Sequence, residues 1–559
     1  MSHKKNIERT RAQESTNAIE KLYISMRHLF SRGFYKPMGI SGETLRKSLL
    51  LLRPEIYGSI AEERVELNGL VYIIERLPEG IEECQFINLT ADEGYRNSHF
   101  KTIIPPKRRR NCYRIDKDQM NIEITRGRSE IYDILTHLTF LFIESHKIQA
   151  KVSLNEGEDF VREWKHLEDV VLHNREITEK EREVIMVHLG NILGRTFDEV
   201  LSTHKIFATE ENPDRFLQLI YWLGKLAINE VDHGKKRSVN FSSVLIEEIG
   251  HHIYGEVWAN DIKSTLKKHS LLQRPIHIIS ANMHSVLNSI YAKGALPKEA
   301  KEHDGFELYQ LLSNSDSKPL QKKVKDYASK NGLIYIKDTS GTNINVQIID
   351  TDKINFDVSP FQKENSLNQS PVIIVMDYAF GEQAYETMDE LLKPYKTPEE
   401  ITHLNVKSVS IMGKAGILEG GKGDIMIPNA HIFEGTADNY PFKNQLSKED
   451  LEGFGVRVFD GTMVSVLGTS LQNKDLLKFF HDSTWNVIGL EMEGAHYQKA
   501  IQSASKIRGN ISKDVQVRYA YYASDNPLET GATLASGGLG MTGVTPTYAI
   551  TQRILEQIF

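Results

Sequence analysis

The stretch Val487-Ile-Gly-Leu-Glu-Met-Glu-Gly-Ala495 decides the interpretation of the fold. Its apolar first half predicts a buried strand, and its small residues predict a helix that starts directly afterwards. Two carboxylates, Glu491 and Glu493, flank Met492 at this junction. Charged side chains are rarely fully buried without partners, so the pair needs an explanation. An acidic residue also stabilises a helix N-terminus by opposing its dipole, which would explain one such glutamate.

A second stretch further along the chain also ends in polar groups. Val515-Gln-Val-Arg-Tyr-Ala-Tyr-Tyr-Ala523 predicts another strand, which ends at Ser524 and Asp525. The carboxyl ends of strands are the usual position of ligand-binding groups in an α/β sheet. Two strands that both end in carboxylates therefore favour a binding site.

Together the two motifs resemble the nucleoside phosphorylase superfamily of N-ribosyl hydrolases and phosphorylases. In that family the second glutamate binds the ribose hydroxyls, the methionine packs under the sugar, and the aspartate protonates the purine at N7. The resemblance implies these roles for Glu493, Met492 and Asp525, with Glu491 and Ser524 as further substrate-binding residues. It also implies an α/β fold whose mixed sheet is flanked by helices.

The chemistry suits this assignment. Breaking an N-glycosidic bond leaves positive charge on the sugar and negative charge on the departing base, so the enzyme needs an acid at the base and an anion near the ribose. The run Ser524-Asp-Asn-Pro-Leu-Glu529 is most similar to the AMP nucleosidase branch of the superfamily.

The resemblance also implies a general base that activates water, located just after the first strand of the family fold. Val372-Ile-Ile-Val-Met376 is a continuous apolar run that predicts a central strand buried on both faces. In nucleosidases of the superfamily, a glutamate just after the first strand activates the attacking water. The closest match is Glu382, which could also be an ordinary glutamate at a helix N-terminus.

A glycine turn is expected after the next strand, at Gly413, Lys414 and Gly416. Glycine lets backbone N–H groups approach a ligand closely, and the family has a comparable Gly-x-x-Gly turn. Phosphorylases usually carry an arginine just before it, where Ser410-Ile-Met412 stands here, so water is favoured over phosphate as the nucleophile. Glu419 replaces the arginine of the AMP nucleosidase pattern, which puts binding of a 5′-phosphate in doubt, although Lys414 or Lys422 could supply the charge.

The resemblance covers residues 371–559, the expected catalytic domain. Residues 270–360 are expected to form an α/β connecting segment that completes the sheet, with a strand at Ile276–Ser280 and a helix capped by Asn282 or Ser285. Asp357–Pro371 is polar and turn-rich and predicts a boundary. The turn of Gly461–Leu471 is where the family places a base-stacking residue, which cannot be assigned to one position.

Residues 1–265 predict a mainly helical domain of unknown role. Helical spacing of Ile19, Leu22, Met26, Leu29 and Phe30 supports the first helix. The runs 70–76 and 83–89 predict a small β-hairpin around the turn at 78–80. The run 137–143 predicts a buried helix.

Two polar patterns in this domain have simpler explanations than ligand binding. Lys107-Arg-Arg-Arg110 is expected to be a solvated loop, with phosphate binding as the alternative. Glu248, His252 and Glu256 would share one helical face, a spacing that metal sites use, but the His-Glu-x-x-His pattern is missing. We therefore expect no metal.

Composition sets the remaining limits. The 559 residues suffice for two or three domains, and 26% charged with 40% hydrophobic residues is typical of a soluble chain. A net charge of −7 does not favour nucleic-acid binding. Two cysteines fit a reduced, cytoplasmic setting, and the first residues contain no signal-peptide core. No apolar run approaches the roughly 20 residues of a membrane-spanning helix.

The sequence thus predicts a cytoplasmic purine nucleoside or nucleotide N-ribosyl hydrolase of nucleotide salvage, without a cofactor and, by family resemblance, a homo-oligomer. Its expected partner is a purine nucleoside or nucleotide. The alternatives are a purine nucleoside phosphorylase, a non-catalytic nucleotide sensor and an interaction scaffold. A scaffold would have no chemical need for both Glu493 and Asp525.

Overall fold

The computed structural model describes residues 10–154, 159–173, 177–303, 305–363, 369–436, 438–529 and 539–559, which form two compact units. Unit 1 comprises Met1–Thr125, Glu130–His251 and Ser470–Leu476, and unit 2 comprises Arg126–Ser129, His252–Thr469 and Leu477–Phe559. The first nine residues, where no signal-peptide core is expected, lie outside the described residues, as does 364–368 within the expected boundary.

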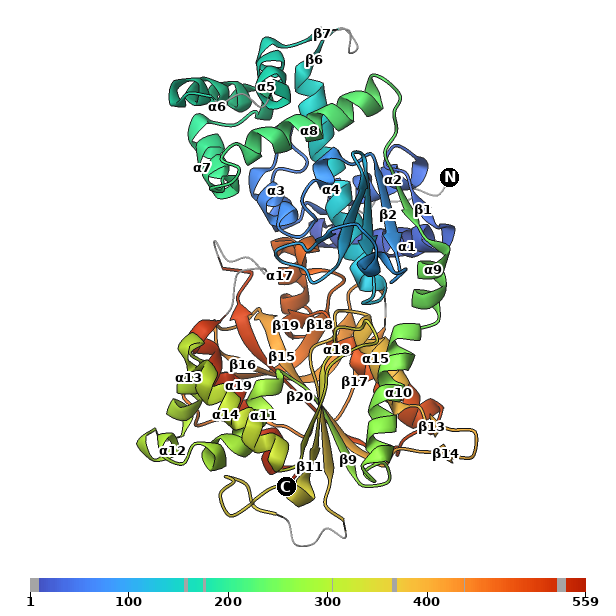
Figure 1. Cartoon of the computed structure of the whole chain (residues 1–559), viewed down its shortest axis with the longest axis vertical. Coiled ribbons are helices and arrows are strands. Elements are labelled where there is room, and N and C mark those ends of the chain that lie inside the picture. Colours follow the sequence, from blue (N-terminus) through green and yellow to red (C-terminus); the bar gives the residue numbers. More distant parts are fainter. Residues whose placement is uncertain are drawn as a thin grey trace, which may run out of the picture. The chain divides into compact units, whose positions relative to one another are not determined.

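Unit 1 combines helices with a small sheet (Figure 1). Its helices are α1 (Arg11–Arg32), α2 (Ile40–Leu52), α3 (Leu67–Ile74), α4 (Arg128–Val152), α5 (Arg162–His173), α6 (Glu179–Leu193), α7 (Phe197–Phe207), α8 (Arg215–Val231) and α9 (Ser243–Gly250). Its strands are β1 (Phe34–Tyr35), β2 (Phe86–Thr90), β3 (Thr102–Ile103), β4 (Cys112–Asp116), β5 (Gln119–Glu123), β6 (Ser153–Leu154), β7 (Asp159–Phe160) and β8 (Ser238–Phe241). The first two residues of α4 belong to unit 2.

The largely helical character predicted for this region is confirmed. The five apolar positions predicted for the first helix are all buried in α1, and Leu138 to Ile143 are buried in α4. Among the described residues, no helix has both the length and the apolar character needed to cross a membrane. Both cysteines, Cys84 and Cys112, are buried and free.

The predicted hairpin is wrong. Residues 67–74 form helix α3, whose start is stabilised by the Glu66 carboxylate accepting hydrogen bonds from the N–H groups of Asn68 and Gly69. A short apolar run cannot be assigned to strand or helix by its periodicity alone. The other half, β2, is a strand, but it pairs with β5 and β8 inside a sheet that has six strands among the described residues, ordered β1-β8-β2-β5-β4-β3.

The basic run at 107–110 is not a solvated loop throughout. Arg108 and Arg110 both pair with Asp133 at 2.9 Å, and Arg110 Nε lies 3.2 Å from Glu130 Oε1. The Arg110 side chain is only 1% exposed. The acidic partners lie on α4 and could not be identified from the run itself.

The single helical face expected for Glu248, His252 and Glu256 does not exist. Helix α9 ends at Gly250, and α10 (Ile253–Lys268) starts after His252, whose φ of 58° breaks the helix. Within the described parts of the chain, no cluster of three or more His, Cys, Asp or Glu residues is placed to hold a metal ion.

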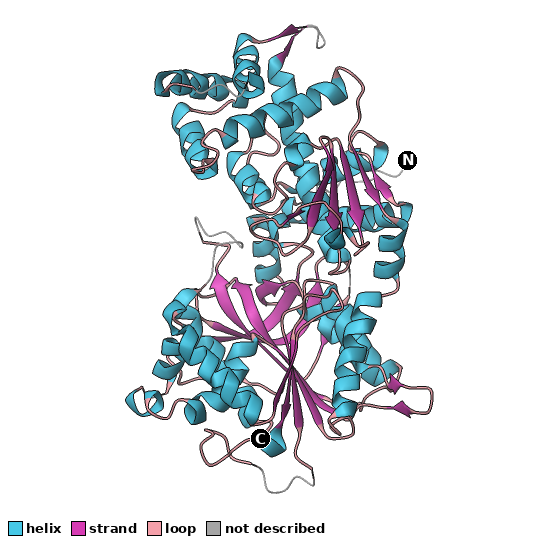
Figure 2. Ribbon diagram, viewed as in Figure 1, coloured by secondary structure: helices cyan, strands magenta, loops and turns pink. Residues whose placement is uncertain are grey.

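Unit 2 is built on a larger mixed sheet (Figures 1 and 2). Its strands are β9 (Ile276–Ser280), β10 (Leu333–Ile336), β11 (Val346–Asp350), β12 (Val372–Met376), β15 (Val406–Ile417), β16 (Ile425–Phe433), β17 (Asn439–Pro441), β18 (Val458–Ser465), β19 (Val487–Glu491) and β20 (Gln516–Asp525), with β13 (Tyr395–Lys396) and β14 (Ile401–Thr402) as a separate pair. Its helices, besides α10, are α11 (Met283–Ala295), α12 (Glu299–Glu302), α13 (Phe306–Ser313), α14 (Lys318–Lys330), α15 (Gln383–Leu392), α16 (Lys448–Leu451), α17 (Lys474–Asp482, which begins in unit 1), α18 (Gly494–Gln502) and α19 (Val544–Glu556).

Helices cover both faces of this sheet, as predicted. Helices α11, α13, α14 and α19 share one apolar core with the strands, and α10, α15 and α18 share another (Figure 1). Strand β12 lies between β9 and β11 and is buried along its whole length, as its apolar run predicted. The 270–360 segment contributes β9, β10 and β11 to the sheet, and Asn282 caps α11 by accepting a hydrogen bond from Ser285 N–H at 2.9 Å.

Five strands of the larger sheet pair in a closed ring, β15-β20-β16-β18-β19 and back to β15. The two motifs that organise the sequence lie at the carboxyl ends of β19 and β20, which both neighbour β15 in this ring. Ring closure therefore brings these two strand ends to opposite sides of the carboxyl end of β15.

Candidate active site

A cavity of about 300 Å³ opens in unit 2 at the carboxyl ends of β9, β15, β19 and β20. This volume lies near the lower limit of small-molecule sites, which span roughly 300–1,000 Å³. All seven residues predicted for substrate binding line it, namely Gly413, Lys414, Gly416, Glu491, Met492, Glu493 and Ser524. The catalytic candidates Asp525 and Glu382 are not among the lining residues.

Glu491 is engaged by the protein itself. One carboxylate oxygen accepts hydrogen bonds from the backbone N–H groups of Glu493, at 2.5 Å, and of Gly494, and the other accepts one from Ser465 Oγ. The Glu491 carboxylate thus accepts hydrogen bonds from N–H groups at the start of α18. Stabilisation of this helix N-terminus is therefore sufficient to explain a glutamate at position 491. Burial raises the pKa of Glu491 to about 7.

Glu493 has a different environment. Its Oε1 accepts a hydrogen bond from Gly381 N–H at 2.8 Å, and its side chain lines the cavity. Burial, and next the charge of Glu491, raise the pKa of Glu493 to about 8. The carboxylate can therefore take a proton or accept hydrogen bonds from hydroxyl groups in the neutral pH range.

Asp525 lies beside the cavity and is joined to it through Ser524. The Ser524 hydroxyl donates to Asp525 Oδ1 and lies 3.1 Å from the Ala415 carbonyl oxygen. Asp525 Oδ2 is buried and has no hydrogen-bond partner among the described residues. Burial raises the pKa of Asp525, opposed by the Ser524 hydrogen bond and the charges of Lys414 and Lys422. A carboxyl group with a raised pKa and one free oxygen is suited to donating a proton.

The expected glycine turn is wrong, because Gly413 and Gly416 lie within strand β15. A Cβ at Gly413 would lie 3.5 Å from the Tyr378 ring, an ordinary contact, so a side chain would fit there. Between the glycines, Lys414 lines both the main cavity and a second cavity of about 220 Å³. Tyr522 also lines both, so the two cavities share a wall.

Glu382 is held away from the lining of the main cavity. Its carboxylate pairs with Arg128 at 3.3 Å, and its N–H donates to Ser129 Oγ at 2.8 Å. Moreover, β12 is not the first strand of this sheet, because β9 precedes it in the chain. No acidic residue occurs between β9 and Glu299, but His284 lies in the first turn of α11 and lines the second cavity.

Several lining residues were not predicted from the sequence. Ser280 ends β9, and its hydroxyl lies 3.1 Å from that of Tyr497. Tyr521, Tyr522, Tyr378 and Thr469 complete much of the apolar wall. Tyr521 and Tyr522 stand three and two positions before Ser524 in the same strand, which is a usable signal. The position of Ser280 instead depends on the pairing of β9 with β15.

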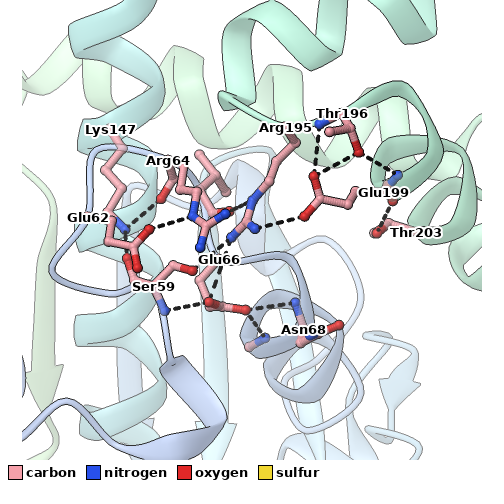
Figure 3. A network of polar contacts seen from close by, with 12 residues as sticks. Ser59, Glu62, Arg64, Glu66, Asn68, Lys147, Arg195, Thr196, Glu199 and Thr203 are labelled. Carbon is pink, nitrogen blue, oxygen red and sulfur yellow. Dashed lines mark hydrogen bonds and ion pairs between the residues drawn. The ribbon is translucent and has the colours of Figure 1, made fainter.

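Unit 1 contains a cavity of about 350 Å³ beside a polar network (Figure 3). Arg195 lines it, but its guanidinium donates to the Val65 carbonyl at 2.6 Å and to Glu199 and Ser59 at 3.1 Å each. Glu66 accepts from Ser59 N–H at 2.6 Å. These groups join the loop before α3 to the start of α7. We therefore assign this network a structural role and not a ligand-binding one.

The chain matches one described family. "Family of unknown function (DUF6909)" matches residues 43–302 and 295–559. No curated protein matches the chain.

Solved structures similar to the chain include three nucleoside-processing enzymes. The 5′-methylthioadenosine/S-adenosylhomocysteine nucleosidase of Campylobacter jejuni is 10% identical, with 51% of this chain and 99% of that chain covered and a TM-score of 0.31. Futalosine hydrolase of Helicobacter pylori is 12% identical, with the same coverage and a TM-score of 0.30. Uridine phosphorylase isoform 2 of Schistosoma mansoni is 12% identical, with 55% and 90% covered and a TM-score of 0.30. Likenesses this weak carry no functional argument.

Proposed function

Because the chain belongs to a family described only as one of unknown function, we propose its activity from its own site: hydrolysis of the N-glycosidic bond of a purine nucleoside or nucleotide. The observation that carries the proposal is the pairing of two different carboxyl environments at one cavity. Glu493 lines the cavity, whereas Asp525 beside it has a raised pKa and an unpartnered buried oxygen. An acid and a potential anion on two sides of one substrate are what this bond cleavage needs.

The proposed reaction breaks the bond between C1′ of the sugar and N9 of the purine. Water supplies the oxygen that joins C1′, and the electron pair of the broken bond passes into the purine ring. Asp525 gives its proton to N7, so that the base leaves without negative charge. Glu493 accepts hydrogen bonds from the ribose hydroxyls, and Met492 packs against the sugar.

The proton lost by water needs an acceptor, and the chain offers two candidates. Glu382 is the one predicted from the sequence, but it is paired with Arg128. His284 lines the second cavity, and burial lowers its pKa, opposed by the charge of Asp377, so its imidazole is neutral and able to accept a proton near pH 7. We assign water activation to His284 because it follows β9, the first strand of the sheet.

A phosphorylase is the second candidate function. Lys414 lies between the two cavities, where its charge could hold either a free phosphate or the 5′-phosphate of a nucleotide. The sequence lacks the arginine that phosphorylases place before this strand end, having Ser410, Ile411 and Met412 instead. Hydrolysis is therefore preferred.

The test is incubation of the full chain with AMP, adenosine, inosine and guanosine, each with and without inorganic phosphate. Free purine with ribose or ribose 5-phosphate, formed without phosphate, is the expected result. Ribose 1-phosphate formed only with phosphate would indicate phosphorolysis. Tight binding of a nucleoside by calorimetry without any product would favour the nucleotide sensor. The absence of both binding and product would refute the proposal.

A further inference from the structure

Four residues from the N-terminal half of the chain belong to the unit that contains the cavity. Arg126–Ser129, here called the strap, is assigned to unit 2, whereas the residues on either side of it, Thr125 and Glu130, belong to unit 1. The strap spans the end of the loop after β5 and the first two residues of α4. It touches the loop of residues 377–382, which joins β12 to α15.

The strap holds this loop at two residues, Phe380 and Glu382. The Arg126 guanidinium lies over the Phe380 ring, 5.1 Å from its centroid. Ser129 Oγ accepts the Glu382 N–H at 2.8 Å, and Arg128 Nη1 lies 3.3 Å from Glu382 Oε1. The Arg128 and Glu382 side chains are only 22% and 16% exposed, so solvent screens this ion pair less than one at the surface.

Gly381 lies between the two anchored residues and contacts both Ser129 of the strap and Glu493, which lines the cavity. Its N–H donates to Glu493 Oε1 at 2.8 Å. A Cβ at Gly381 would lie 2.4 Å from Ser129 Oγ and 2.6 Å from Ser129 Cβ, and its φ of +56° also favours glycine. The backbone here is thus pressed directly against Ser129, and any shift of the strap would move the donor that holds Glu493.

The strap is equally close to the next helix. Gly127 has a φ of +75°, and a Cβ there would lie 2.9 Å from Glu386 Oε1 on α15. The strap therefore contacts the C-terminal half of the 377–382 loop directly, and it lies against Glu386 of α15, the helix that follows.

From these contacts we infer that the strap positions the sugar-binding carboxylate: Ser129 and Arg128 hold the 377–382 loop so that Gly381 N–H orients Glu493 toward the cavity. The inference rests on the proposed function in one respect, that Glu493 binds ribose hydroxyls. Ser129 and Arg128 are positioning residues, because they act on the substrate only through the loop and Glu493.

The test compares Ser129→Ala with Ser145→Ala. Ser145 also lies on α4 and is buried, and its hydroxyl accepts from Arg237 and donates to the Phe142 carbonyl, both at 3.0 Å, but it is far along the helix from the strap. Misplacing a binding group by about 1 Å can lower catalysis by about 10²-fold. We expect Ser129→Ala to lower kcat/KM for ribosides by up to about tenfold, no more than a change of Glu493 itself, with a clearly smaller loss for 2′-deoxyribosides. Ser145→Ala should leave the ratio between the two sugars unchanged.

A second measurement does not depend on turnover. Amide hydrogen exchange of residues 380–382 should be faster in Ser129→Ala, and to a lesser degree in Arg128→Met, than in the parent and in Ser145→Ala. Unchanged exchange, or equal losses on both sugars, would overturn the inference. If the parent cleaves no nucleoside but Ser129→Ala still releases the loop, the proposed function fails while the structural role of the strap stands.

Discussion

Two strand-to-helix junctions of the larger sheet are built in opposite ways. The junction between β19 and α18 is held from nearby, since Glu491 accepts from Glu493, Gly494 and Ser465, the last only 26 positions away. The junction between β12 and α15 is held by Ser129, 253 positions away. The β19–α18 junction can therefore be predicted from short stretches of sequence. The β12–α15 junction depends on a distant segment that no local sequence pattern connects to it.

The two junctions meet at one hydrogen bond, from Gly381 N–H to Glu493 Oε1. If the comparison is correct, the catalytic and substrate-binding groups lie at the ends of β9, β19 and β20, and the end of β12 only supports them. Substitutions at these strand ends should accordingly differ in kind as well as in size.

The largest effect is expected at Asp525, outside both junctions. Asp525→Asn keeps the shape of the side chain but removes the proton that the leaving base needs. General-acid catalysis contributes about 10²–10⁴-fold, and we expect a loss of that size in kcat with nearly unchanged affinity for a non-cleavable nucleoside. Steady-state kinetics and calorimetry measure the two quantities. A rate within threefold of the parent would mean that the base is activated elsewhere.

These contrasts also show how far the sequence could predict the structure. The strand at 487–491, the buried strand at 372–376 and the Asn282 cap were predicted because each depends on residues close in the chain. Helix α3 was predicted as a strand because its apolar run fits either structure until Glu66 caps it. The helix break at His252 was not predicted, although Gly250, two positions earlier, ends α9.

The candidate site divides in the same way. The residues at the ends of β19 and β20 were recognisable as a motif, and they line or adjoin one cavity. Ser280 and Ser129 were missed because each reaches the site through tertiary contacts, one by strand pairing and the other by the strap. Glu382 was chosen because it follows the apolar run 372–376, but β9, β10 and β11 of the same sheet precede that strand in the chain.

The next effect separates the two candidates for the general base. His284→Gln should lower hydrolysis by about 10²-fold, the lower end of the general-base range, with affinity for a non-cleavable nucleoside retained. Glu382→Gln should change hydrolysis only a few-fold, because the amide oxygen can still accept from Arg128 and the backbone bond to Ser129 is kept. The reverse order of losses would restore Glu382 as the base and place chemistry at the β12 junction.

A smaller and sugar-selective effect is expected at Glu493. Above about pH 8, where Glu493 is ionised, replacing its carboxylate by an amide in Glu493→Gln removes charge-assisted hydrogen bonds, which are about twice as strong as neutral ones. We expect kcat/KM for ribosides to fall by about tenfold, with less loss for 2′-deoxyribosides. Rates on matched adenosine and 2′-deoxyadenosine measure this. Equal losses on both would remove the 2′-hydroxyl from the role of Glu493.

The smallest effect is a pH dependence of stability at the β19 junction. Burial raises the pKa of Glu493 to about 8, whereas in the unfolded chain it returns to about 4.5. Between these values the folded chain holds a proton that the unfolded chain has lost, so stability falls as pH rises and the loss is complete above pH 8. Buried histidines with lowered pKa values, such as His431 at about 3, act in the opposite direction only below about pH 6.5.

Between pH 6.5 and 8, the pH dependence of stability therefore reports on buried glutamates with raised pKa values and not on the buried histidines. One raised group changes the free energy of unfolding by about 1.4 kcal/mol per pH unit across this range. Glu493→Gln should reduce the stability lost between pH 6.5 and 8 by about 1–2 kcal/mol, whatever its effect on stability at either pH. Chemical denaturation at both pH values measures this difference, and Glu419→Gln, at an exposed position in the same unit, is the control. If the parent and Glu493→Gln show the same pH dependence of stability, the Glu493 carboxyl group is not buried in its protonated form. The β19 junction would then not differ from the β12 junction by containing a buried, protonated carboxyl group.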